Sequence, residues 1–84
     1  MDDPKRRQEL ENSWRARVKV AEQEYHRARD QAEAALERCG CESTSAEIEA
    51  LMRARAREST ALDEYMRALR ILHDLVVAGK PPDS

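Results

Sequence analysis

The sequence predicts an all-α protein, an antiparallel and coiled-coil-like hairpin of two long helices. Ala, Glu, Lys, Leu and Arg make up 46 of the 84 residues, a share typical of coiled coils and long helices. Neither residues 5–39 nor residues 45–78 contain Gly or Pro, so nothing in either interval breaks a helix. The segment between the two intervals is short, which makes consecutive helices antiparallel neighbours.

The first helix is expected over residues of about 4–39. Asp3 and Pro4 supply an N-cap and a first helical residue, the positions at which Asp and Pro favour a helix start. Its apolar residues recur in heptads along two lines, Trp14–Ala21–Ala28–Ala35 and Val18–Tyr25–Ala32–Cys39. Mostly charged residues flank this narrow stripe, so it is wide enough for one neighbouring helix.

The turn between the helices is expected at residues 40–44. Gly40 can take the left-handed conformation that ends a helix. Thr44 and Glu47 have the spacing of a capping box, in which each side chain bonds to the backbone amide of the other residue. Both signals predict a break in the helix near the midpoint of the chain.

The second helix is expected over residues of about 45–78. Gly79 is placed to form a left-handed C-cap, and the prolines that follow prevent the helix from continuing. Residues 80–84 are expected to form a short disordered tail. The whole chain, residues 1–84, is thus interpreted as a single helical hairpin.

The second helix has a broader apolar face than the first. Its two core lines are expected to be Ile48–Leu62–Leu69–Val76 and Leu51–Tyr65–Leu72, and its flanking lines are Ala54–Ala61–Ala68–Leu75 and Met52–Ser59–Met66–His73. One narrow stripe cannot cover a face of this width. We therefore expect a homodimer, because twofold dimers are the commonest assembly, and two hairpins would form a four-helix bundle with the second helix nearer its centre.

Composition and motifs argue against an enzyme. Only 13 residues are Leu, Ile, Val or Phe, which is too small a core to wall a deep pocket. No phosphate-binding loop, nucleophile elbow or metalloprotease His pair is found, and no cofactor is expected. The sequence therefore predicts a protein–protein interaction or scaffold module that acts as a hairpin dimer, with a second protein as a further candidate partner.

The expected recognition surface is the apolar C-terminal part of the second helix, with Trp14 as the anchor from the first helix. Trp14 should lie near this part once the hairpin folds back. The predicted interface residues are Trp14, Tyr25, Leu62, Tyr65, Met66, Leu69, Ile71, Leu72, Leu75 and Val76.

Charge and hydropathy indicate a cytoplasmic protein without a membrane or nucleic-acid partner. The 15 basic and 17 acidic residues nearly balance, so there is no strong field to attract nucleic acid or a membrane surface. The longest apolar run, residues 75–78, is too short to span a bilayer. No apolar segment typical of a signal peptide follows the N-terminus.

Two alternative functions remain open at this point. Antiparallel four-helix dimers such as Rop bind RNA on a helix face, so a Rop-like RNA-binding regulator is one alternative, although the aromatic residues lie on the helix seam rather than among the arginines. The other is a thiol or metal sensor that uses Cys39 and Cys41 as candidate ligands. The simpler interpretation makes Cys39 a small core residue and Cys41 a loop thiol.

Arg55 and Glu58 interrupt the apolar lines of the second helix. We expect the two side chains to reach the edge of the interface and to pair with each other, since residues three apart are neighbours on a helix surface. A charge pair used for binding inside a bundle is the alternative.

Overall fold

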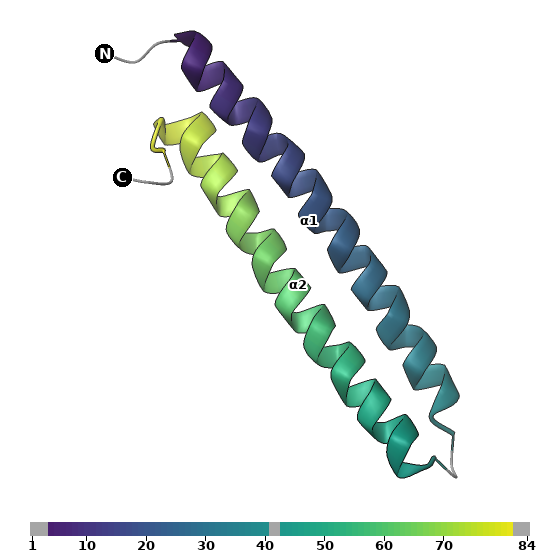
Figure 1. The fold of residues 1–84 in the computed structure, drawn as a ribbon. Coiled ribbons are helices and arrows are strands. Elements are labelled where there is room, and N and C mark those ends of the chain that lie inside the picture. The colour runs from purple at the N-terminus through teal and green to yellow at the C-terminus, as the bar shows by residue number, and fades with distance from the viewer. Residues whose placement is uncertain (1–3, 41–42, 82–84) are drawn as a thin grey trace.

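The computed structural model describes residues 4–40 and 43–81, which form two long helices side by side (Figure 1). Helix α1 spans Pro4–Arg38 and helix α2 spans Ser45–Ala78. No strand occurs in these described ranges. The predicted all-α hairpin is therefore confirmed.

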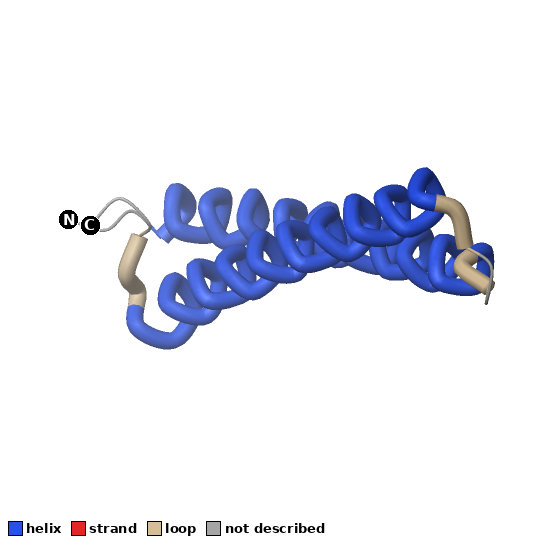
Figure 2. The backbone as a smooth tube through the Cα atoms, turned by 90° about the horizontal axis from the view of Figure 1, so that it is seen from below, coloured by secondary structure: helices blue, strands red, loops and turns tan. Residues whose placement is uncertain are grey.

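The hairpin is a thin rod. It measures 63 × 18 × 16 Å, with a radius of gyration of 18.0 Å, against about 12 Å for a compact domain of this length. Figure 2 shows the two helices crossing at a shallow angle along the rod, the arrangement typical of coiled-coil packing. The expected N-cap Asp3 and the tail residues 82–84 lie outside the described residues.

Helix α1 ends without the left-handed glycine that was expected. The Cys39 amide donates to the carbonyl oxygens of both Ala35 and Leu36, at 3.2 and 3.1 Å, so the last turn tightens toward a 3₁₀ geometry. Gly40 does not have a positive φ, and the prediction for this residue was wrong. The Ser43 hydroxyl donates to the Gly40 carbonyl at 2.6 Å, and this bond helps to hold the turn.

Helix α2 begins with the predicted Thr44 cap. Thr44 is extended, with φ −76° and ψ 161°, and its hydroxyl oxygen accepts the Glu47 amide at 3.2 Å. The Glu47 carboxylate accepts the Thr44 hydroxyl at 3.2 Å, so its contact is to the side chain of Thr44. This cap satisfies one of the amides that a helix start leaves without an intrahelical partner.

Helix α2 ends at the predicted Gly79 cap, which is confirmed. Gly79 has φ 65° and ψ 24°, and the amides of Gly79 and Lys80 both donate to the Asp74 carbonyl. Arg7 Nη2 from α1 donates to the Leu75 carbonyl at 3.4 Å. A cation at the C-terminus of a helix is favourable because that end carries partial negative charge.

The core between the helices consists mainly of alanines and differs from the expected one. The buried residues are Val18, Ala28 and Ala32 on α1 and Ala54, Ala68 and Leu75 on α2. The alanine line that was expected to flank the core of α2 thus faces α1, and the Ile48–Leu62–Leu69–Val76 line lies outward. Small residues on both helices let the axes approach closely, which the larger side chains of the outer line would prevent.

Candidate interaction surface

Two adjacent heptad seams run along α2. The inner seam faces α1 and consists of Leu51, Ala54, Glu58, Ala61, Tyr65, Ala68, Leu72 and Leu75. The outer seam follows each inner position by one residue, about 100° around the helix. The outer seam consists of Ile48, Met52, Arg55, Ser59, Leu62, Met66, Leu69, His73 and Val76.

The two seams differ sharply in exposure. Leu75 on the inner seam is 2% exposed, whereas Met66 on the outer seam is 58% exposed and Leu69 is 36% exposed. The large apolar residues of the outer seam are all exposed. Arg55, Ser59 and His73 interrupt this line. Six large apolar residues on one helix face still mark it as a candidate interaction surface, whereas scattered apolar residues need no explanation.

The ten predicted interface residues divide between the two seams. Half of them lie at the contact between the helices: Trp14, Tyr25, Tyr65, Leu72 and Leu75. Four others come together on the outer seam: Leu62, Met66, Leu69 and Val76. Ile71 is half-buried on the opposite flank of the inner seam. Ile48 and Met52 extend the outer seam toward the turn, and their heptad spacing from Leu62 and Met66, respectively, was the signal that could have added them to the prediction.

Both aromatic residues of α1, the expected anchor Trp14 and the predicted interface residue Tyr25, are engaged within the hairpin. Tyr25 stacks on Tyr65 of α2, with ring centroids 6.1 Å apart and planes inclined by 26°, a favourable offset arrangement. Trp14 is half-buried, and the Arg17 guanidinium carbon lies 4.5 Å from the centre of its ring, within the range of a cation–π contact. The outer seam of α2 is therefore the more available apolar surface.

The flank of the outer seam on the side away from α1 carries both charged and apolar residues. This flank consists of Glu49, Ala56, Asp63, Arg70 and Val77, all exposed. Within residues 4–40 and 43–81, no ion pair is formed by Asp63 or Arg70. The two residues border a shallow hollow over the outer seam that Met66, Leu69 and His73 also line.

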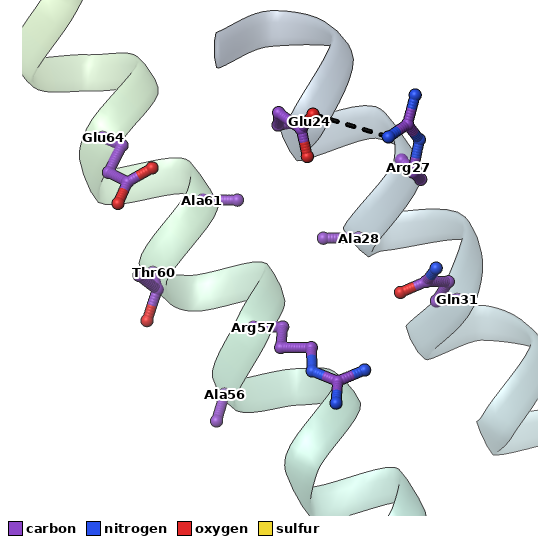
Figure 3. A pocket seen from close by; sticks show the side chains of 9 residues that line it. All are labelled: Glu24, Arg27, Ala28, Gln31, Ala56, Arg57, Thr60, Ala61 and Glu64. Atoms are coloured by element: carbon purple, nitrogen blue, oxygen red, sulfur yellow. Dashed lines mark hydrogen bonds and ion pairs between the residues drawn. The ribbon is translucent and has the colours of Figure 1, made fainter.

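A second groove lies between the helices on the opposite face of the hairpin. Figure 3 shows Ala28 and Ala61 pointing toward each other across it, with Glu24 and Arg27 paired at 3.4 Å on its α1 side. Arg57 and Glu64 are among the residues that line its α2 side. The mixed charges and the open shape favour neither an anion nor a cation.

The thiol of Cys39 takes a structural position. Cys39 is half-buried and its Sγ lies 3.5 Å from the Glu47 carbonyl oxygen, where α1 ends against the start of α2. Cys41, the other candidate metal ligand, lies outside the described residues. In the part of the chain that the structure describes, no three His, Cys, Asp or Glu side chains gather to hold a metal ion.

Arg55 and Glu58 are separated rather than paired. Glu58 is half-buried on the inner seam and Arg55 is exposed on the outer seam. No ion pair joins them among the described residues. The expected pairing was wrong, and each charge instead interrupts a different seam.

Neither helix, as far as the structure describes it, is both long enough and apolar enough to pass through a membrane. No protein-family model matches the chain, and no curated protein or solved structure is significantly similar to it.

Proposed function

We propose that this protein is a non-enzymatic interaction module that acts as a homodimer through the outer seam of α2. The proposal depends on one observation. The outer seam keeps coiled-coil spacing from Ile48 to Val76 and its large apolar residues are exposed. A heptad line of this kind is built to pack against another helix.

The accessible surface area of the chain is large enough for an interface with a second copy. The accessible surface is 6752 Å², whereas a compact monomer of 9.7 kDa would expose about 5100 Å². A standard interface buries roughly 800 Å² on each partner. The hairpin therefore has enough surplus surface for one such interface.

A second copy of the chain is the occupant that the outer seam fits best. Twofold dimers bury the same patch on both subunits, and the apolar residues of the outer seam are distributed along the whole of α2. Pairing two such seams would place both α2 helices at the centre of a four-helix bundle with the α1 helices outside. Such a dimer is suited to presenting two equivalent outer faces to further proteins.

Light scattering on the purified protein under reducing conditions tests the proposal. We expect a dimer mass for the natural chain and a monomer mass for Leu69→Asp, because a charge in the outer seam would have to be desolvated on pairing. Val20→Asp is the matched control, because Val20 is an exposed apolar residue of α1 and its substitution should leave the dimer intact. A monomer mass for the natural chain would overturn the proposal.

A further inference from the structure

Resting on the proposed function, we infer that the two outer seams pair antiparallel in a single register. In that register the twofold axis crosses α2 between Arg67 and Ala68, and Asp63 of each copy pairs with the partner's Arg70. The inference follows from where the outer seam carries charge, and from the free charges on its flank.

Arg55 decides the orientation. In a parallel pair, each seam residue packs against its own copy, so Arg55 would meet the partner's Arg55 inside the interface. Two like charges that are partly desolvated repel strongly. In the antiparallel register, Arg55 comes level with the partner's Lys80, beyond Ala78 where α2 ends, and the guanidinium of Arg55 stays in water.

The same register places Leu62, Met66, Leu69 and Val76 at the centre of the interface, while Ile48 and Met52 lie beyond the end of the partner's α2. In an antiparallel coiled coil, each layer of the core pairs the a position of one helix with the d position of the other. With this axis, the layers are Leu69 with the partner's Met66, Leu62 with the partner's His73, and Val76 with the partner's Ser59, each occurring twice. Leu69 and Met66 border the hollow on α2, so each copy would cover the hollow of the other.

Charge complementarity selects this register from its neighbours. Asp63 and Arg70 each follow an outer-seam residue and share one flank, and a twofold axis across the helices brings this flank of both copies to the same side. Asp63 and the partner's Arg70 then differ in level by about 3 Å at 1.5 Å per residue.

The other registers are less favourable. A shift of the partner by one heptad toward the turn brings Asp63 close to the partner's Asp63. A shift by one heptad in the opposite direction brings Arg70 close to the partner's Arg70. A shift by two heptads toward the turn buries Arg55 against the partner's Met66. Each of these costs free energy through like-charge repulsion or through an unpaired charge in the interface.

Charge reversal tests the register. Asp63→Arg and Arg70→Asp should each raise the dimer Kd roughly tenfold, because two symmetry-related attractions become repulsions. The double variant D63R/R70D should recover a Kd close to that of the natural chain. Glu64→Arg is the matched control, because Glu64 lines the groove on the opposite face and its reversal should leave the Kd unchanged.

Spin labels test the orientation independently. Arg53 is exposed and lies away from the outer seam, and Arg53→Cys in a Cys39→Ser, Cys41→Ser background accepts one label on each chain. The inferred register separates the two labelled positions by about 43 Å along the rod, whereas a parallel pair places them side by side.

The outcomes separate the two proposals. A monomeric natural chain overturns both of them. A dimer in which D63R/R70D fails to recover, or in which the labels lie side by side, overturns the register and orientation and leaves the homodimer standing. Circular dichroism of each variant, unchanged in helicity, excludes loss of the fold as the cause.

Discussion

The two helices are nearly equal in length, yet they differ in how many neighbours they can accept. Of the exposed large apolar residues, α1 carries only Val20 and Leu36, and α2 carries the other seven. Helix α1 thus has one apolar stripe, which α2 covers. Helix α2 has that stripe and a second one beside it. Matched length therefore builds the hairpin, whereas the width of the apolar face decides whether a helix can accept a further partner.

The two seams of α2 also differ in side-chain size. Alanines recur at every second position of much of the inner seam, and Leu, Ile, Met and Val dominate the outer seam. Small side chains let α1 approach closely, so the hairpin buries short side chains tightly. Large side chains bury more apolar area for each residue, so the outer seam offers the larger apolar area to the proposed partner.

The largest difference between the two seams is expected when a leucine on each is replaced by aspartate. Leu72→Asp places a charge against α1 and is expected to abolish most of the helical circular dichroism signal, since removing a leucine contact and burying an unpaired charge each cost several kcal/mol. Leu69→Asp, three residues earlier on the outer seam, should lower the mass while keeping much of the helicity. Equal loss of helicity in both variants would show that the seams are not distinct.

A smaller truncation measures the packing of the inner seam. Leu75→Ala should lower the free energy of unfolding by about 2–4 kcal/mol, because Leu75 is the most deeply buried large side chain described and its loss leaves a cavity. Val77→Ala should change it by less than about 0.5 kcal/mol, as expected of an exposed side chain. Urea denaturation followed by circular dichroism compares the two, and similar values would contradict the burial difference.

The smallest effect is expected at the turn, which both helices share. Thr44→Ala removes the oxygen that accepts the Glu47 amide and should cost about 1 kcal/mol of stability. Thr44→Ser keeps that oxygen and should lie within a few tenths of a kcal/mol of the natural chain. Thermal unfolding of the two variants is the measurement, and an equal loss in both would show that the cap contributes little.

The caps of α2 were predicted well from the sequence, because few residue types fit a cap position. Thr44 caps α2 and Gly79 ends it in the left-handed conformation, because few other residues satisfy those positions without cost. Gly40 shows the limit of the same reasoning. Glycine permits a left-handed residue but does not require one, and hydrogen bonds from Cys39 together with Ser43 shape this turn instead.

The interface prediction was harder because two overlapping heptads occupy one helix. Leu69 and Leu72 lie three residues apart and look alike in sequence, yet they lie on different seams. Side-chain size favoured the larger line as the core. The structure favours the alanine line opposite α1, and that preference depends on the side chains of the other helix, which a pattern within α2 cannot contain.

The amino-acid sequence alone determined two uninterrupted helices, the place where the chain turns back, and an apolar excess on the second helix. These properties follow from backbone conformation and from spacing within one segment. Packing between the two helices selected which of the two heptads on α2 meets α1 and which faces outward. Close packing is a property of two surfaces together, so the alanines of α1 select the alanines of α2 and leave the larger side chains outside.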